Sequence, residues 1–245
     1  MMKVIVNGAC GRMGKEVVRL VNSGFEDSTL AASVDKFGTL DILTSFDDVN
    51  VDADVIVDFS NPEALNELLA YAQRTKTALV VATTGFSAEQ LETIRKASEN
   101  IPIFLSYNMS LGIALLVRMA KQVASVFKSA DVEIVEIHHN RKLDAPSGTA
   151  LMLAEAVKEV RPDSEFVFGR SGSHRREKNE IGIHSLRMGN ITGEHDVIIS
   201  TDSQTITLKH EVHDRALLAE GALSAAAFLV GKPAGMYSME DILKD

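Results

Sequence analysis

The chain has 245 residues, 45% of them hydrophobic, and a formal net charge of −9, so it can bury a large aliphatic core but is unsuited to binding nucleic acid or anionic membranes generally. The lone Cys10 excludes an internal disulfide and a metal site built on several cysteines. The first apolar run is too short for a signal peptide and no run approaches the roughly 20 residues of a membrane span, so we expect a cytoplasmic protein.

The first hundred residues alternate short β-rich runs with helical patterns. This alternation predicts an α/β fold with a doubly wound, Rossmann-like parallel sheet. The expected strands are Lys3–Asn7, Thr29–Val34, Val55–Asp58, Ala78–Ala82 and Ile103–Leu105. The expected helices run from about Arg12 to Asn22, from Pro62 to Tyr71, and onward from Ser87, which is placed to cap its helix.

A glycine-rich turn, Gly8-Ala9-Cys10-Gly11-Arg12-Met13-Gly14, joins the first expected strand to the first helix. A dinucleotide pyrophosphate binds at this place in a Rossmann-like fold. The spacing departs from G-x-G-x-x-G, but Asp35 ends the second strand, where an acid accepts hydrogen bonds from the adenosine ribose. A tight turn followed by an ordinary loop acid is the alternative.

The residues around Asp35 leave the choice of cofactor open. The carboxylate favours NADH because it repels the 2′-phosphate of NADPH, whereas the adjacent Lys36 partly neutralises that repulsion. Arg12 is also placed to reach a phosphate. We therefore expect NADH, NADPH or both as cofactors.

Two further turns, Ala82-Thr83-Thr84-Gly85 and Ser106-Tyr107-Asn108-Met109, each follow an apolar strand. The carboxyl ends of parallel strands share one edge of the sheet, so both turns are expected to line the same crevice. Their hydroxyl, amide and backbone groups suit a ribose or a nicotinamide carboxamide. Ordinary loop chemistry would explain either turn alone.

After Asn108 the pattern changes to that of an α+β domain. Its expected helices are Leu111–Val126 and Thr149–Val160, and its expected strands are Val132–Ile137, Ile183–Arg187, Glu194–Ser200 and Thr205–Glu211. Short turns between the last three strands favour antiparallel pairing, giving a mixed or antiparallel sheet. The polar stretch 169–178 is expected to form an exposed loop, and a final helix, Ala216–Val230, to return to the first domain.

The segment from Glu136 to Ala150, EIHHNRKLDAPSGTA, is rich in groups that can act on a small anion. His138 is a candidate proton donor because imidazole titrates near neutral pH. Lys142 offers an ammonium that can bind a carboxylate or take part in proton delivery. Glu136 and Asp144 are placed to orient these groups. The alternative is an exposed basic loop without function.

Ser147, Gly148 and Thr149 start a helix, and backbone N–H groups at a helix start bind carboxylates with help from the helix dipole. We expect no metal site, because His138 and His139 are adjacent and lack a histidine four residues on. The histidines interpreted as structural are His174, His184, His195, His210 and His213.

These motifs resemble the 4-hydroxy-tetrahydrodipicolinate reductase (dihydrodipicolinate reductase) family along nearly the whole chain. The most specific matches are the glycine turn and the segment from Glu136 to Ala150. Weaker ones are Asp58-Phe59-Ser60-x-Pro62, Thr83-Thr84-Gly85 and Gly193-Glu194-His195. The resemblance implies reduction of 4-hydroxy-tetrahydrodipicolinate, a small dicarboxylate, with NAD(P)H in lysine and diaminopimelate biosynthesis.

The resemblance also implies an organisation and a set of site residues. Residues 1-109 and 216-245 would bind the dinucleotide, and residues 110-215 would bind substrate and assemble a homotetramer. His138 and Lys142 match catalytic positions, and the substrate-binding set is His139, Ser147, Gly148 and Thr149. The cofactor-binding set is Gly8, Ala9, Cys10, Gly11, Arg12, Met13, Asp35, Lys36, Ala82, Thr83, Thr84, Ser106, Tyr107, Asn108 and Met109.

Three departures from the family pattern leave the cofactor preference open. Ala82 stands where glycine is usual, Met109 where an aromatic residue is common, and Lys36 where arginine often favours NADPH. Two other functions remain as alternatives. One is a nicotinamide-dependent reductase of a sugar or semialdehyde, and the other is a dinucleotide sensor without catalytic activity.

Overall fold

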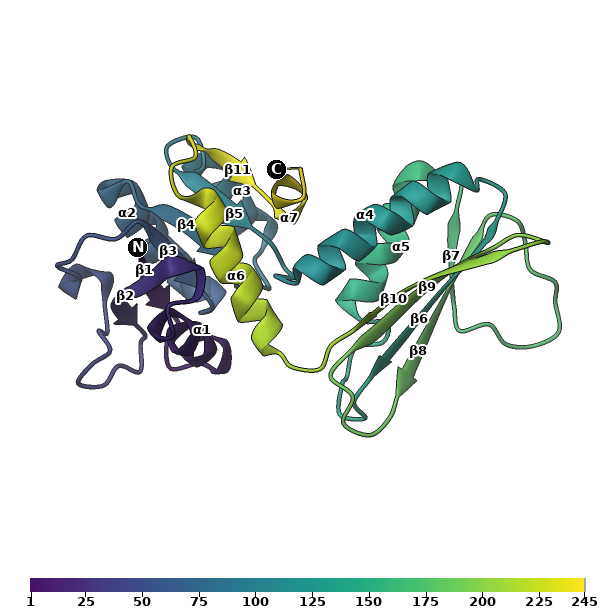
Figure 1. The fold of residues 1–245 in the computed structure, drawn as a ribbon, viewed down its shortest axis with the longest axis horizontal. Helices are drawn as coiled ribbons and strands as arrows, with labels where there is room; N and C mark the ends of the chain where they lie inside the picture. The colour runs from purple at the N-terminus through teal and green to yellow at the C-terminus, as the bar shows by residue number, and fades with distance from the viewer. Residues whose placement is uncertain (245) are drawn as a thin grey trace. The chain divides into compact units, whose positions relative to one another are not determined.

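The computed structural model describes residues 1–244, and the chain divides into two compact units. Unit 1 comprises Met1–Ser110 together with the described residues from Ala216 onward, and unit 2 comprises Leu111–Arg215. Figure 1 shows the chain leaving unit 1 once and returning to it through its last long helix. Each unit is built on its own sheet.

Within residues 1–244, unit 1 contains a six-stranded parallel sheet in the order β11-β5-β4-β3-β1-β2. Its strands are β1 (Met2–Asn7), β2 (Ser28–Val34), β3 (Val55–Asp58), β4 (Ala78–Val81), β5 (Pro102–Leu105) and β11 (Gly235–Tyr237). Its α-helices are α1 (Arg12–Asn22), α2 (Leu65–Thr75), α3 (Ala88–Ala97), α6 (Ala216–Leu229) and α7 (Met239–Ile242). The predicted Rossmann-like, doubly wound sheet is confirmed.

Helices cover both faces of this sheet because its strands are apolar on both sides. Ile5, Ile56 and Leu79 pack with residues of α2 and α3 in one core cluster. On the other face α6 packs against α1 and the central strands, and Phe104 of β5 meets Phe228 of α6 edge to face at 6.3 Å. The small residues of α6 permit this close approach.

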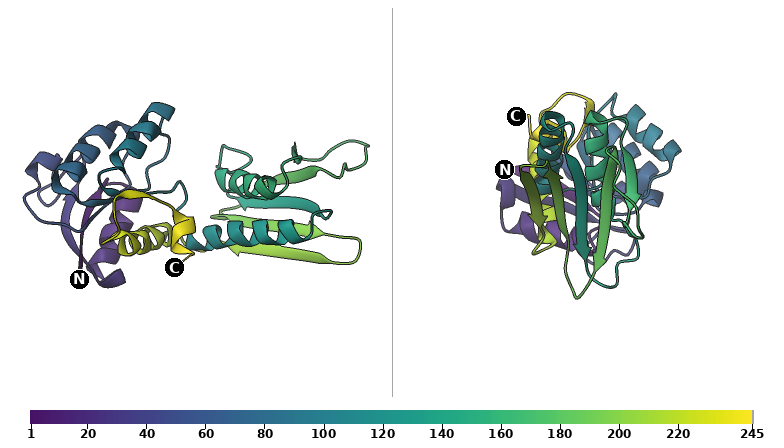
Figure 2. Two further views of the ribbon diagram at one scale, coloured as in Figure 1. Left: turned by 90° about the horizontal axis from the view of Figure 1, so that it is seen from above. Right: turned by 90° about the vertical axis from the view of Figure 1, so that its right-hand side faces the viewer.

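Within the described residues, unit 2 has a five-stranded mixed sheet in the order β10-β9-β6-β8-β7. The strands are β6 (Asp131–His138), β7 (Glu165–Phe168), β8 (Glu180–Arg187), β9 (Glu194–Ser200) and β10 (Thr205–Glu211). The helices α4 (Leu111–Val126) and α5 (Gly148–Val160) pack on one face, which Figure 2 shows from two directions. Alternate residues of β6 and β9 therefore point into a core beneath these helices.

One pairing expected from the sequence is wrong. The strands Ile183–Arg187 and Glu194–Ser200 were expected to be antiparallel neighbours, but β6 lies between them and pairs parallel with β8 and antiparallel with β9. The chain from Met188 to Gly193 is longer than a two-residue hairpin turn and leaves room to pass the end of β6. The antiparallel pairing of β9 with β10 is confirmed.

The remaining differences concern short elements. The strands β7 and β11 were not predicted, and they have only four and three residues. A 3₁₀ turn, Pro62–Ala64, precedes α2, which ends at Thr75 rather than Tyr71. Ser87 caps α3 as predicted, in a capping box with Gln90. None of the helices in residues 1–244 combines the length and apolarity that crossing a membrane requires.

Candidate functional site

The glycine turn of unit 1 is tight enough to require glycine at two positions. Gly8 has a φ of +78°, and a Cβ there would lie 2.4 Å from the backbone oxygen of Phe59. A Cβ on Gly14 would lie 2.0 Å from the backbone oxygen of Gly8, so α1 packs directly against the turn. The turn thus brings bare backbone and the start of α1 to the carboxyl edge of the sheet, where a pyrophosphate can approach.

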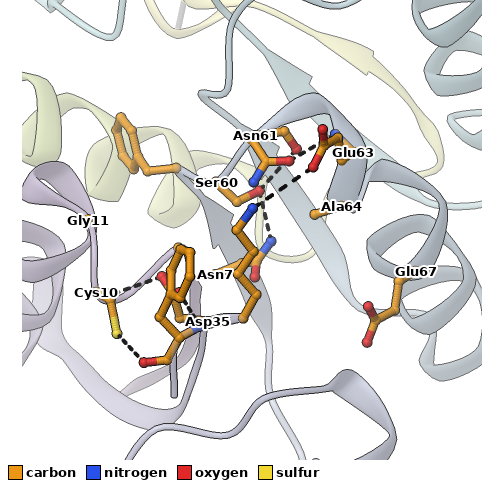
Figure 3. A pocket seen from close by; sticks show the side chains of 13 residues that line it. Asn7, Cys10, Gly11, Asp35, Ser60, Asn61, Glu63, Ala64 and Glu67 are labelled. Carbon is orange, nitrogen blue, oxygen red and sulfur yellow. Dashed lines mark hydrogen bonds and ion pairs between the residues drawn. The ribbon is translucent and has the colours of Figure 1, made fainter. Parts of the chain in front are cut away.

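The Asp35 carboxylate is fixed beside this turn. Its Oδ2 accepts a hydrogen bond from the Cys10 N–H at 3.0 Å, and its Oδ1 accepts one from the Phe37 N–H at 2.9 Å. The residue is only 9% exposed, yet it lines an open cavity (Figure 3). Each oxygen keeps further lone-pair capacity, so the carboxylate can accept hydrogen bonds from the hydroxyls of a ribose.

The cavity has a volume of about 410 Å³, and all its lining residues belong to unit 1. They are Asn7, Gly8, Cys10, Gly11, Asp35, Lys36, Phe37, Phe59, Ser60, Asn61, Glu63, Ala64 and Glu67. It combines a glycine backbone, an acid at the end of β2 and the apolar surface of two phenylalanines. Those groups fit the pyrophosphate, ribose and adenine of a dinucleotide respectively.

The buried carboxyl group of Asp58 bonds two side chains that line this cavity. It is 1% exposed, and its Oδ1 accepts hydrogen bonds from Asn7 Nδ2 at 2.7 Å and from Ser60 Oγ at 2.6 Å. Burial raises the pKa of Asp58, and these donors act against that effect. Asn7 and Ser60 both line the cavity, so Asp58 fixes the shape of its wall without facing the ligand.

The other predicted cofactor residues follow the same strand edge. Ala82 and Thr83, directly after β4, are buried, and Thr84 is exposed. After β5, Tyr107 is 53% exposed and the Met109 side chain is fully buried. The remaining predicted residues are placed as follows: Ala9 is buried, Arg12 is exposed, Met13 is half-buried, Lys36 is exposed beside Glu63, and Ser106 donates to the backbone oxygen of Asn108.

In unit 2, the functional cluster is centred on Glu136, which is fully buried. Arg187 of β8 binds its carboxylate in a fork, at 2.7 Å to Oε1 and 2.9 Å to Oε2. The Ser147 N–H donates to Oε1 at 3.1 Å, and His138 Nδ1 lies 2.5 Å from Oε2. Burial acts to raise the pKa of Glu136, but His138 and Arg187 outweigh it and hold the pKa well below its usual range.

Glu136 therefore keeps its negative charge and orients His138. Its carboxylate accepts the proton on Nδ1, which leaves Nε2 as the ring nitrogen that can exchange a proton with a ligand. A Cβ on Gly193 would lie 3.0 Å from that Nε2, so the glycine keeps space beside it. The predicted orienting role of Glu136 matches this contact.

His195 packs against His138 from β9. The two rings are 5.2 Å apart and nearly perpendicular, and His195 Nε2 lies 3.2 Å from Ser147 Oγ. Burial, aided by His138, lowers the pKa of His195 to about 4. The ring is therefore neutral at pH 7 and acts as a packing and hydrogen-bonding support for His138 and Ser147.

Lys142 and His139 lie in the loop after β6. The Lys142 ammonium is 2.8 Å from Asp144 Oδ1, and Asp144 is itself tied to the cluster because its backbone oxygen accepts a hydrogen bond from Arg187. His139 Nε2 lies 3.4 Å from an Arg215 nitrogen, and burial followed by the charge of Arg141 lowers the pKa of His139. Asp144 thereby holds the Lys142 ammonium in the loop that directly follows β6.

The start of α5 completes the unit 2 site. Ser147 caps the helix, since its Oγ accepts a hydrogen bond from the Ala150 N–H at 3.2 Å. Gly148 is exposed, a Cβ there would meet no atom within 4 Å, and its N–H makes no hydrogen bond within residues 1–244. An anion can therefore reach the backbone at the positive end of the helix. Thr149 is half-buried in the same turn.

The sequence analysis missed Arg187 in the unit 2 cluster and the role of Asp58 in unit 1, and it interpreted His195 as structural. Arg187 was seen only as the end of a strand, and Asp58 in unit 1 only as part of a weak motif. The register supplies the missing signal, because Glu136 pairs with His195 on β9 and His138 pairs with Arg187 on β8. Among residues 1–244, the acidic, histidine and cysteine side chains form no group of three or more that could hold a metal ion.

The two units together provide a dinucleotide-type cavity and an oriented imidazole beside an anion cradle. The class of protein that this fold and these groups define is a Rossmann-type, nicotinamide-dependent oxidoreductase. Two family models match the chain: "Dihydrodipicolinate reductase, N-terminus" over residues 2–109 and "Dihydrodipicolinate reductase, C-terminus" over residues 112–243. The chain belongs to the dihydrodipicolinate reductase family.

Relatives along the full length agree. A 4-hydroxy-tetrahydrodipicolinate reductase from Caldanaerobacter subterraneus subsp. tengcongensis is 45% identical, covering 100% of this chain and 99% of that protein. The enzyme of the same name from Clostridium novyi is 44% identical with the same coverage. A solved structure, dipicolinate-bound dihydrodipicolinate reductase from Paenisporosarcina sp. TG-14, is 25% identical, has a TM-score of 0.82 and covers 99% of both chains.

Proposed function

We propose that the protein reduces 4-hydroxy-tetrahydrodipicolinate to tetrahydrodipicolinate with NADH or NADPH, a step of lysine and diaminopimelate biosynthesis. The observation that carries the proposal is the oriented pair of Glu136 and His138 beside the open start of α5. This arrangement provides a proton donor and an anion site in one unit. The full-length relatives carry the name of this activity.

Unit 1 is proposed to bind the cofactor. The turn from Gly8 to Met13 approaches the pyrophosphate, and Asp35 accepts hydrogen bonds from the adenosine ribose. The loops 82–84 and 106–109 follow β4 and β5 at the same edge, and we assign them to the nicotinamide end. The buried Met109 side chain restricts its part in this set to its backbone.

Unit 2 is proposed to bind and protonate the substrate. Lys142, His139 and the backbone at Gly148 and Thr149 hold the carboxylates, and Ser147 fixes that backbone by capping α5. The 4-hydroxyl leaves as water together with a proton of the adjacent ring carbon, which gives a conjugated imine, and a nicotinamide bound in unit 1 would supply hydride for its C4. The electron pair of the C3–C4 double bond shifts toward the ring nitrogen. His138 Nε2 then delivers a proton to C3 of the resulting enamine.

We also propose the domain roles and the assembly. Residues 1-109 with 216-245 act as the dinucleotide domain, and residues 110-215 as the substrate and oligomerisation domain of a homotetramer. The sheet face of unit 2 that α4 and α5 leave uncovered supports this assembly, since Val135, Ile137 and Ile198 lie on it half-buried and Leu186 is 40% exposed. Light scattering should give a mass four times that of the chain. We place the enzyme in the cytoplasm, where its proposed cofactors and substrate are metabolites.

A coupled assay tests the activity. Freshly generated 4-hydroxy-tetrahydrodipicolinate is mixed with enzyme and NADH or NADPH, and cofactor oxidation is followed by absorbance. We expect turnover with this substrate and none with a panel of sugars and semialdehydes. Turnover with a panel compound alone would overturn the substrate assignment, and dinucleotide binding without any turnover would indicate a sensor rather than an enzyme.

A further inference from the structure

The cavity of unit 1 carries an excess of negative charge around the position proposed for the adenosine ribose. Its charged lining residues are Asp35, Glu63 and Glu67 against the single cation Lys36. Figure 3 shows Asp35 on one side of the cavity, and Glu63 and Glu67 on the other. A ribose diol is uncharged, whereas a 2′-phosphate brings up to two negative charges to the same place.

Lys36, the cation among the described lining residues, is already paired with a carboxylate. Lys36 Nζ lies 3.9 Å from Glu63 Oε2, at the start of the segment that leads into α2. In the sequence analysis, Lys36 was the reason to keep NADPH as a possible cofactor, because it follows Asp35 directly and can neutralise the charge of that carboxylate. Because Lys36 pairs with Glu63, its positive charge is offset by a second carboxylate, and the net charge of the cavity lining stays negative.

The two other carboxylates, Asp35 and Glu67, are held in place by hydrogen bonds from neighbouring residues. Asp35 is fixed by the N–H groups of Cys10 and Phe37. Glu67 Oε1 accepts hydrogen bonds from the Phe46 N–H at 2.9 Å and from Ser45 Oγ at 2.8 Å. Neither can swing away from an approaching phosphate without losing these bonds. No arginine lines the cavity in the part of the chain that the structure describes, and arginine is the usual partner of a 2′-phosphate.

We propose that Glu63 is a specificity-determining residue that makes this protein prefer NADH, because it neutralises Lys36 and leaves the cavity repulsive to a 2′-phosphate. The inference rests on the proposed function, since it concerns the same dinucleotide site. Glu63 is suited to a clean test because its side chain is 87% exposed and Lys36 is 58% exposed. An ion pair this exposed contributes little to folding stability.

The test is a fluorescence titration of the full-length protein with NADH and with NADPH, in the absence of substrate. We expect the wild type to bind NADH about tenfold more tightly, and the ratio to shrink as salt is raised from about 0.05 M to 0.5 M. Glu63→Gln frees the Lys36 ammonium, and we expect it to tighten NADPH binding by about threefold to fivefold while NADH binding changes less. Adding Lys36→Met to that variant should abolish the gain.

Glu99→Gln is the matched control, because Glu99 is an exposed glutamate before β5, at the sheet edge opposite the strand carboxyl ends. It should leave the NADH-to-NADPH ratio at the wild-type value. Equal affinity for the two dinucleotides in the wild type, or a Glu63→Gln variant that shifts both equally, would refute the role of Glu63 while leaving the reductase assignment intact. Binding of neither dinucleotide would instead refute the proposed function, and this inference with it.

Discussion

Replacing Glu136 with glutamine should weaken proton donation by His138 while the rest of the unit 2 site stays in place. The amide oxygen is expected to take the Oε1 position, because Arg187 and the Ser147 N–H both donate there. The amide NH₂ group then takes the Oε2 position, where it donates to His138 Nδ1 and leaves one Arg187 N–H without its acceptor. That hydrogen bond holds the ring in the tautomer with a bare Nδ1 and removes the anion that stabilises the imidazolium. The ring stays in place but carries the transferable proton of an imidazolium less often.

The contact to His138 sets the size of the effect. A hydrogen bond to a charged group contributes about 1.5–3 kcal/mol, and Arg187 already offsets part of the Glu136 charge through its fork. We therefore take the lower part of that range, about 1.5–2 kcal/mol, which corresponds to a decrease in kcat of about 10- to 30-fold. Affinity for NADH should change little, because the dinucleotide cavity lies within unit 1.

The assay is steady-state turnover of Glu136→Gln, with NADH affinity measured in parallel and thermal unfolding used to confirm that the variant is folded. Glu133→Gln is a close control. Glu133 lies on the same strand but faces the other side, and it also pairs with a histidine and an arginine, His184 at 2.8 Å and Arg176 at 3.1 Å. Because Glu133 lies on the face proposed for assembly, light scattering is used to confirm that the control keeps the wild-type mass. With that mass intact, the control should keep kcat within about twofold. Equal losses of kcat in the two variants, or full kcat in a folded Glu136→Gln variant, would show that Glu136 has no special role in proton donation by His138.

Three further outcomes are expected. Lys142→Ala should lower kcat and raise KM for the substrate, and unaltered kinetics would remove Lys142 from the site. Gly14→Ala should destabilise unit 1 by about 1–3 kcal/mol in urea unfolding and abolish NADH binding, because its Cβ would lie 2.0 Å from the Gly8 oxygen; tight NADH binding by this variant would contradict the packing described. The pKa of His195 is lowered to about 4 in the folded protein, against about 6.5 in the unfolded chain. The neutral ring therefore contributes its full stability above pH 6.5, and this contribution is lost as the pH falls toward 4. Between pH 7 and pH 5 the wild type should therefore lose about 2 kcal/mol more unfolding free energy than His195→Gln, and equal losses would show that the ring is not held neutral.

Much of the fold was predictable because its signals are local. The helices Arg12–Asn22 and Leu111–Val126 and the strand Val55–Asp58 have the predicted bounds. The two helices are marked by a helical hydrophobic period. The strand is marked by a continuous apolar run that ends at Asp58. The strands β7 and β11 carry no such signal, because three or four residues are too few to establish a period.

The partners of the functional groups were less predictable, because they depend on strand register rather than on spacing along the chain. His138 and the start of α5 lie in one continuous segment, so the sequence alone was enough to propose them as parts of one site. Arg187 and His195 reach Glu136 and His138 only because β8 and β9 pair with β6 on opposite sides. The sequence analysis predicted β8 and β9 as direct neighbours, and this prediction was wrong because β6 lies between them. No motif near these strands indicates that order.

In the proposed reaction, unit 1 binds the dinucleotide and His138 of unit 2 supplies the proton. This division of roles is tested most directly by measuring NADH affinity and single-turnover NADH oxidation for His138→Gln beside the wild type, with freshly generated substrate. We expect nearly unchanged NADH affinity and a rate lowered by about 10²- to 10⁴-fold, the usual contribution of a general acid. Wild-type turnover in the variant, or a loss of NADH binding as large as the loss of rate, would contradict this division of roles.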